Sequence, residues 1–406
     1  MPNPDSLSPQ SPSAPRPTGL PVILIARTAL NVPFRLSHFF LPAIARGLSV
    51  SLSAGSTLVS AASLMGLVAP LFGALSDRSG GRRIMVLGTA LLVAGALLTA
   101  SVPLYGVALV GFAFIGLAKI AFDPALQVFL GQRVPYERRG RALGLSELSW
   151  SLSLLAMPLC GWLIDAVSWR APFVLLGLAG LPIWWLTRSA LPGDVPADDD
   201  ALPPDWDLKR AFTSLVVPIR EVWADPQSRL ALATTALIGF AQINVIVVYG
   251  AWMEDRFGLS VGSLGLVTLV MGAAEFLAEL AVAFISDRVG KRRSVFVSVV
   301  FTGLAYLALP RLTGSLTAAL IGSAVMIFFF EFTIVGLVPL VSGMNAEARG
   351  SLMSLSRAIA SVSHAIAALV GVALYASGDI GRNGPVSALA CFLLFLVLLR
   401  LRERRH

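Results

Sequence analysis

Residues 73–83 read GALSDRSGGRR, and residues 283–293 repeat this pattern as AFISDRVGKRR. A second pair of stretches behaves in the same way, since ERRGRALGL at 137–145 returns as EARGSLMSL at 347–355. Both pairs have the same spacing, because 283 − 73 and 347 − 137 are each 210. Two unrelated motifs with one spacing indicate a duplicated chain, with halves of about 200 residues each.

The composition indicates that lipid is the main solvent of this chain. Of its residues, 56% are hydrophobic and 13% are charged, whereas soluble domains carry about 25% charged residues. In such a chain, two similar halves are typical of a transporter with alternating access. Cys160 and Cys391 both lie in apolar runs, so we expect buried hydrophobic side chains there, with no disulfide, metal or other cofactor.

A helix needs about 20 mostly apolar residues to cross a membrane. Twelve segments meet this requirement, at 21–44, 51–75, 84–103, 105–131, 142–165, 171–189, 229–251, 261–285, 294–310, 314–341, 350–376 and 384–400. We therefore predict an all-α membrane protein with two pseudo-symmetric six-helix bundles, over 21–190 and 229–402. A cytoplasmic linker at 191–228 would join them, and residues 1–20, rich in Pro and Ser, would form a disordered cytoplasmic tail.

The basic residues predict the orientation in the membrane. With both termini in the cytoplasm, most of the 31 Lys and Arg face that side, and the opposite loops hold only Arg46, Arg170, Arg256, Arg311 and Arg382. Cytoplasmic loops of membrane proteins carry this excess. The net charge of +8 is then explained by anionic lipids, without nucleic acid. The expected location is a bacterial inner membrane, crossed many times.

The loop pattern Gly-x-x-x-Asp-Arg-x-Gly-x-Arg-Arg after predicted helices 2 and 8 resembles the hallmark loop of the major facilitator superfamily. The Arg-Gly loops after helices 4 and 10, and WRAPF at 169–173, are also similar to that superfamily. The resemblance is nearest to efflux permeases of drugs or sugars and implies a monomer. Two signatures of the drug–proton antiporter branch are absent or incomplete, at 112–116 in helix 4 and at 157–162 in helix 5.

The repeated loops are predicted to hold the two halves together on the cytoplasmic side. Gly73 has no side chain, so a neighbouring helix can approach it closely. Asp77 and Asp287 are each expected beside the start of a helix from the other half, where a carboxylate is stabilised by about 0.3–1 kcal/mol. The basic residues either take part in this gating or anchor the loops to lipid headgroups. The predicted gating residues are Gly73, Asp77, Arg78, Arg82, Arg139, Asp287, Arg288, Arg292 and Arg349.

Ionisable residues inside the spans mark the candidate transport path, because a charge at the bilayer centre costs at least about 2.5–3.5 kcal/mol. The resemblance places helices 3, 6, 9 and 12 outside the bundle, and their interiors hold no ionisable residue. The candidates for the substrate and proton path, with two polar residues of helix 7, are Arg35, His38, Lys119, Asp123, Glu147, Gln242, Tyr249, Glu275, Glu331 and Arg357.

A structural role competes with the functional one at several of these positions. Lys119 and Asp123 are at i and i+4, so they can form an ion pair within one helix. Arg27 lies near the cytoplasmic end of helix 1, where its side chain can reach the interface. Glu331 stands alone in the apolar run at 326–334. A carboxylate there, balanced between burial and an Arg across the cavity, can couple protonation to a conformational change.

These features together predict a secondary active transporter that moves a small organic solute by proton-coupled efflux. No nucleotide-binding Gly-x-x-x-x-Gly-Lys loop occurs, which argues against ATP as the energy source. Protons and membrane lipids are the expected partners besides the solute. The alternatives are a lipid or amphiphile flippase of the same fold, or a membrane-embedded sensor or enzyme. An enzyme would need a nucleophile–base pair or metal ligands at membrane depth, and the sequence offers neither, so we expect no enzymatic activity.

Overall fold

The computed structural model describes residues 19–134, 136–194, 222–342 and 349–401, and these contain helices and no strand. The helices of the N-terminal half are α1 (Leu20–Phe39), α2 (Leu41–Gly47), α3 (Leu52–Leu64), η1 (Met65–Val68), α4 (Ala69–Ser79), α5 (Gly81–Ser101), α6 (Tyr105–Arg133), α7 (Tyr136–Leu152), η2 (Ser153–Ala156), α8 (Met157–Ala166) and α9 (Ala171–Ala190). Those of the C-terminal half are α11 (Pro226–Phe257), α12 (Val261–Val289), α13 (Lys291–Ala308), η4 (Leu309–Arg311), α14 (Leu316–Ser342), α15 (Arg349–Leu374), η5 (Tyr375–Ser377) and α16 (Asn383–Arg400).

Twelve helical stretches in the described part are long and apolar enough to cross a membrane. The predicted all-α fold with twelve spans is therefore confirmed. Two of the spans are interrupted by a 3-10 turn, at η1 and at η2, and each turn is followed by a proline, Pro70 and Pro158. Proline lacks a backbone N–H and cannot continue the regular hydrogen-bond ladder of a helix. Both interrupted spans line the boundary between the halves.

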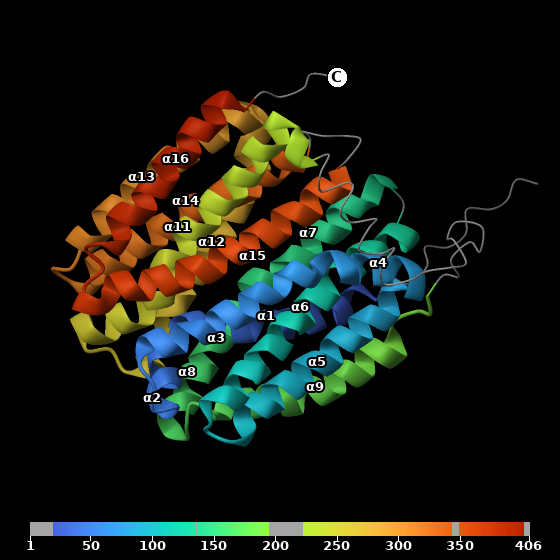
Figure 1. Cartoon of the computed structure of the whole chain (residues 1–406), viewed down its shortest axis with the longest axis horizontal. Coiled ribbons are helices and arrows are strands. Elements are labelled where there is room, and N and C mark those ends of the chain that lie inside the picture. Colours follow the sequence, from blue (N-terminus) through green and yellow to red (C-terminus); the bar gives the residue numbers. More distant parts are fainter. Residues whose placement is uncertain (1–18, 135, 195–221, 343–348, 402–406) are drawn as a thin grey trace, which may run out of the picture.

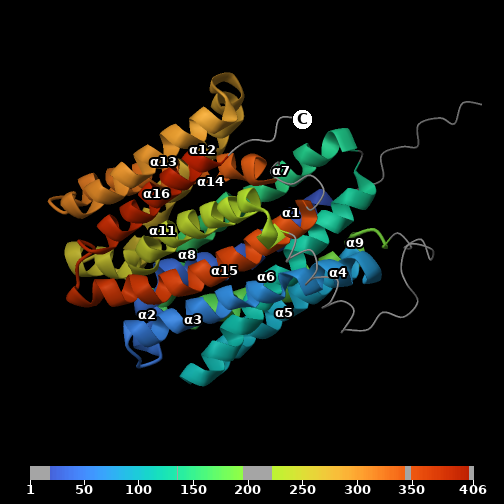
Figure 2. The same ribbon diagram turned by 45° about the horizontal axis from the view of Figure 1, so that its top comes forward.

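The two halves lie side by side, with α1–α9 in blue to green and α11–α16 in yellow to red (Figure 1). Across their boundary, α3 packs against α15 and α8 packs against α12. The view in Figure 2 shows the same pairing of α3 with α15. We call the end of the bundle that holds Gly19 and Leu401 the tail end, and the opposite end the far end. The tail end is on the right in Figure 1.

The sequence duplication is visible in matching hydrogen bonds of the two halves. Gly80 and Gly290 have φ of 91° and 96°, a conformation that glycine adopts without steric cost. Just after each glycine, an arginine reaches the end of the sixth span of its own half. Arg82 donates to the carbonyl of Arg188, and Arg292 donates to the carbonyl of Leu398 at 3.3 Å. Donor and acceptor are both displaced by 210 residues, since 292 − 82 and 398 − 188 are equal.

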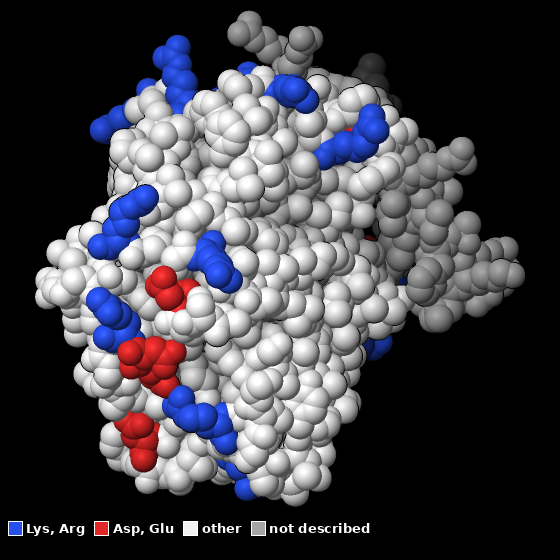
Figure 3. Space-filling view, turned by 60° about the vertical axis from the view of Figure 1, so that its left-hand side comes forward, with Lys and Arg blue, Asp and Glu red and all other residues white. Residues whose placement is uncertain are grey.

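The surface has the charge distribution of a chain that crosses a membrane. Figure 3 shows a broad surface without charged side chains, bordered at the far end by a band in which acidic and basic side chains alternate. Large apolar side chains are exposed on many spans, for example Trp162, Leu266 and Phe392. Apolar side chains exposed in this number are expected where the neighbour is lipid.

Candidate functional site

Five charged side chains form what we call the tail-side cluster: Arg27, Lys119, Asp123, Glu147 and Arg357. Asp123 is at its centre, buried on α6, with its carboxylate 3.0 Å from Arg27 Nε and 3.2 Å from Lys119 Nζ. Arg357 approaches the same carboxylate to 3.8 Å from α15, in the other half. Arg27 also donates to Glu147 at 2.9 Å. Each charge in this cluster therefore faces an opposite charge.

The structure shows how two basic members of the tail-side cluster are paired. The ion pair predicted between Lys119 and Asp123 is confirmed. The position of Arg27 near the helix end suggested that its side chain reaches the interface. In the structure Arg27 is instead buried, with 5% exposure. Its side chain turns inwards because Asp123 and Glu147 supply two carboxylates there.

The second group, which we call the central cluster, joins the two halves and consists of Arg35, Trp150, Glu275, Glu279 and Glu331. Arg35 on α1 donates through both terminal nitrogens to Glu275 on α12, one of these bonds being 2.9 Å long. The Arg35 guanidinium also lies 3.9 Å from the ring centroid of Trp150. Arg35 follows Arg27 by eight positions, so the two residues are about 12 Å apart along α1. The clusters approach each other at Trp150, whose ring centroid is 5.5 Å from Lys119 Nζ.

The remaining two carboxylates of the central cluster lack a basic partner. Glu331 on α14 is 5% exposed, and its side chain lies near Trp150. Glu279 on α12 accepts a hydrogen bond of 3.0 Å from Ser151 Oγ. Neither Glu279 nor Glu331 forms an ion pair with any side chain that the structure describes.

The two clusters differ in the balance of their charges. The tail-side cluster has three basic and two acidic side chains, whereas the central cluster has one basic and three acidic ones. A buried carboxylate without a positive partner is costly, so such a site favours the uptake of a proton or of an organic cation. The central cluster is thus the part of the molecule suited to bind and release charge.

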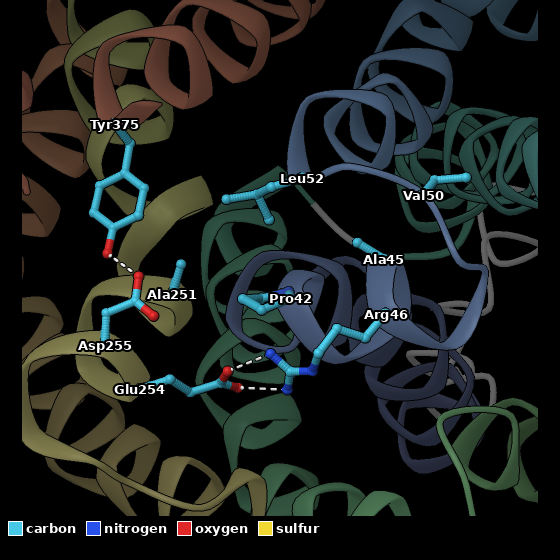
Figure 4. A pocket seen from close by; sticks show the side chains of 9 residues that line it. All are labelled: Pro42, Ala45, Arg46, Val50, Leu52, Ala251, Glu254, Asp255 and Tyr375. Carbon is cyan, nitrogen blue, oxygen red and sulfur yellow. Dashed lines mark hydrogen bonds and ion pairs between the residues drawn. The ribbon is translucent and has the colours of Figure 1, made fainter. Parts of the chain in front are cut away.

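The far end is closed by contacts between the halves. Figure 4 shows Arg46 of α2 reaching both carboxylate oxygens of Glu254 on α11, at 2.6 and 3.2 Å, beside a cavity of about 190 Å³. Asp165 at the end of α8 accepts a 2.6 Å hydrogen bond from the Gly262 amide in the first turn of α12. Gly250 lies so close to the Phe39 carbonyl that an added Cβ would be 1.9 Å from its oxygen.

Comparison with known proteins places the chain in a family. The family described as Major Facilitator Superfamily matches residues 24–242 and 231–406. The chain belongs to the major facilitator superfamily. Among its relatives are the uncharacterized MFS-type transporter YceJ of Bacillus subtilis, 25% identical over 88% of each chain, and the class C tetracycline resistance protein of Escherichia coli, 25% identical over 83% of each. The lysophospholipid transporter LplT of Yersinia pestis is 24% identical over 48% of this chain and 46% of its own.

This member of the superfamily brings most of the predicted path residues into the two clusters. Arg35, Lys119, Asp123, Glu147, Glu275, Glu331 and Arg357 all belong to one or the other. His38 is buried one turn beyond Arg35, and its Nε2 has no hydrogen-bond partner among the described residues. Tyr249 packs instead at the far end, against Phe39 and Trp252, and Gln242 is half-buried on α11.

The predicted gating residues of this facilitator lie at the tail end. Asp77, Arg78, Arg288 and Arg292 are exposed there. A Cβ built on Gly73 meets no described atom within 4 Å, and the start of the helix expected beside it includes residues outside the described part of the structure. Arg82 and Arg292 bind the last turn of a span within their own half. The side chains of Arg139, Asp287 and Arg349 lie outside the described part of the structure.

Sequence reasoning missed four contributors to the site of this facilitator: Trp150, Ser151, Asp165 and the Arg46–Glu254 pair. A carboxylate beside a helix start of the other half was predicted at the tail end, and the structure shows such a contact between the halves at the far end, where Asp165 meets α12. At the tail end, Asp194 accepts from the Arg82 amide at the start of α5, within one half. The signal for Asp165 was present in the sequence, since it ends the fifth predicted span as the only acid of that turn. Trp150 gave no such signal, because an aromatic residue in an apolar helix is most often a packing residue.

Proposed function

We propose that this transporter expels a small organic solute from the cytoplasm in exchange for protons, with the central cluster as the shared site. The observation that supports this most is Glu331, a carboxylate buried between the two halves with no ion pair in the described structure. Its nearest basic residue, Arg35, is already held by both oxygens of Glu275. A proton on Glu331 removes the cost of a buried unpaired charge.

The exchange follows from competition for the same carboxylates. A solute that enters the central cluster displaces the proton of Glu331. When the solute leaves, the carboxylate regains a proton. A carrier in which the halves move only when the site is neutralised would therefore couple the two flows.

The contrast between the ends supports alternating access. The far end is sealed by Arg46–Glu254, by Asp165 on α12 and by the packing of Gly250 on Phe39, while a Cβ built on Gly73 at the tail end would meet no described atom within 4 Å. With both termini in the cytoplasm of a bacterium, as the basic loops predict, this conformation would load solute from the cytoplasm. Rocking of the halves would then close the tail end and expose the site on the other side.

A thermal unfolding screen of the purified protein tests this function. Tetracycline, other drugs, sugars and lysophospholipids would each be added at an acidic and an alkaline pH. A ligand that binds only the folded state stabilises it by about 2.7 kcal/mol at a hundredfold excess over Kd. We expect a small-molecule ligand whose stabilisation depends on pH in the wild type and in Glu147→Gln, but not in Glu331→Gln. A ligand whose effect is the same at both pH values in the wild type would contradict proton coupling.

Lipid flipping is the second candidate, and one structural feature favours it. A crevice of about 350 Å³ lies between α7–η2 and α12, and exposed apolar residues line it. The relative LplT is named as a lysophospholipid transporter. If only lysophospholipids stabilise the protein in the screen, flipping replaces efflux as the proposed function.

A further inference from the structure

The crevice between the halves opens on the surface that faces lipid. Its walls include Leu152 and Leu155 on one side and Leu269 and Phe276 on the other, and all four side chains are more than a third exposed. The volume of about 350 Å³ lies at the lower end of the range for small-molecule sites. The crevice can therefore hold the apolar part of a molecule that is still in contact with the membrane.

One polar side chain lines the crevice and connects it to the central cluster. Ser151 is the one hydroxyl residue that lines it, and its Oγ donates to Glu279 at 3.0 Å. Gly272, which also lines the crevice, precedes Glu275 and Glu279 by three and seven residues, so the three share one face of α12. Glu279 is thus one hydrogen bond away from the lining of the crevice, and Glu275 lies one turn from it on the same helix.

The charge beside Ser151 selects the sign of the ligand. Glu279 has no ion pair with any described side chain, and Arg35 is occupied by Glu275 and by the face of Trp150. An anionic headgroup would meet carboxylates without a basic side chain available to it. A cationic group would be attracted instead, and the attraction is strong where water is scarce.

We propose that this crevice admits amphipathic organic cations sideways from the membrane, with the apolar body between α7–η2 and α12 and the positive charge at Glu279. This inference rests on the proposed transport function and names the solute class of its site. An ordinary bilayer lipid would fill the apolar walls equally well, but the phosphate of its headgroup would be repelled by Glu279. The ligand expected here is therefore compact, apolar and positively charged.

Binding of tetraphenylphosphonium to the purified protein in phosphatidylcholine nanodiscs, measured with an ion-selective electrode, tests the proposal. Tetraphenylborate has nearly the same shape and the opposite charge, so it serves as the matched control ligand. We expect tetraphenylphosphonium to bind and tetraphenylborate not to bind. Glu279→Gln should weaken binding by about tenfold, or about 1.4 kcal/mol, because it removes the negative charge and keeps the shape.

A pair of bulky substitutions tests the location. Ala273 is exposed and lines the crevice, so Ala273→Phe should fill it and weaken binding at least tenfold. Ala308 is also exposed, on α13, and does not line the crevice, so Ala308→Phe should leave binding unchanged. Equal binding of both ions, or unchanged binding in Ala273→Phe or Glu279→Gln, would overturn the proposal. If Ala273→Phe abolishes the binding of lysophospholipid instead, the crevice is a lipid site and the proposal is overturned as well.

Failure of this proposal is distinguishable from failure of the transport function. If tetraphenylphosphonium does not bind, the inference is overturned, yet a ligand from the unfolding screen with Glu331-dependent stabilisation would still support proton-coupled efflux. Tetraphenylphosphonium that binds at Glu279 with the same affinity at acidic and alkaline pH, in the wild type and in Glu331→Gln, would support the crevice as a binding site. The same result would contradict the proposed proton coupling.

Discussion

The tail-side cluster and the central cluster share α1, where Arg27 and Arg35 are about 12 Å apart along the helix. Their charges are nevertheless arranged differently. In the tail-side cluster, four of five charges come from the N-terminal half and each has a partner. In the central cluster, the three acids come from the C-terminal half and the one base from the N-terminal half. If the halves separate, the first keeps its ion pairs within the N-terminal half and loses only the contact of Arg357. The second loses its ion pair between Arg35 and Glu275.

This difference separates structural charges from transport charges better than burial does. Asp123 and Glu331 are both almost fully buried, so burial alone would give them the same role. Their partners differ, since three cations surround Asp123 and none forms an ion pair with Glu331 among the described residues. We infer that the tail-side cluster holds α1, α6 and α7 together, and that the central cluster exchanges ligands.

The largest effect is expected from Asp123→Asn. Breaking a buried ion network by removing one partner costs about 3–5 kcal/mol, because the remaining charges are left uncompensated. Here Arg27, Lys119 and Arg357 would all lose their common carboxylate. Thermal unfolding in detergent should show a large loss of stability in this variant.

The matched control is Glu147→Gln in the same cluster. The Glu147 side chain is 60% exposed, and exposed ion pairs contribute only about 0–1 kcal/mol. If both variants unfold at the same temperature as the wild type, the tail-side cluster is not structural and the comparison between the clusters fails.

A smaller loss of stability, with a larger loss of ligand binding, is expected from Glu275→Gln. Arg35 would lose a charge-assisted partner worth about 1.5–3 kcal/mol, but it keeps the face of Trp150 and has other carboxylates close by. The measurement is the unfolding temperature together with ligand binding, in parallel with Asp123→Asn. A Glu275→Gln protein that is less stable than Asp123→Asn but binds ligand normally would reverse the roles assigned to the two clusters.

The sequence predicted most of the fold because its signals are local. Twelve apolar runs predicted twelve spans, and the repeat of 210 residues predicted matching halves, which the Arg82 and Arg292 hydrogen bonds then showed in detail. The pair Lys119–Asp123 was also predictable, because both residues lie on one turn of one helix. Each of these inferences needs only the helical period or the chain itself.

The division into two clusters could not be predicted, because it depends on which helices meet across the halves and how far each is rotated. The periodicity of α12 shows that Glu275 and Glu279 share a face, but not that Arg35 faces the first and Ser151 the second. Counted together, the charges of the path appeared nearly balanced in the sequence. Only the three-dimensional arrangement separates a balanced group from an acidic one.

The assignment of the central cluster to a moving boundary can be tested at two glycines. Gly250→Ala would place a Cβ against the Phe39 carbonyl at the closed far end, whereas Gly73→Ala meets no described atom within 4 Å in this conformation. Maleimide labelling of Val50→Cys, beside the far-end cavity, should become several times faster with Gly250→Ala. Gly73→Ala should not speed it up. The native cysteines, Cys160 and Cys391, are buried and give little background.

Equal labelling rates in the two glycine variants would mean that the far end does not open by separation of α1 and α11. The central cluster would then have no reason to come apart, and the distinction between the clusters would rest on charge alone. A faster labelling rate in Gly73→Ala would have the same consequence, because a substitution at the tail end would then have opened the far end.

The smallest effect is expected from Arg46→Ala. The Arg46 side chain is 59% exposed beside Glu254, so the pair should contribute at most about 1 kcal/mol, and less at high salt. Labelling of Val50→Cys should rise only slightly, and salt added to the wild type should reproduce that rise. The far end would then be closed mainly by backbone packing at Gly250 and by Asp165 on α12. If Arg46→Ala instead opens the far end as much as Gly250→Ala does, the closure is electrostatic, and an exposed ion pair controls access to the central cluster.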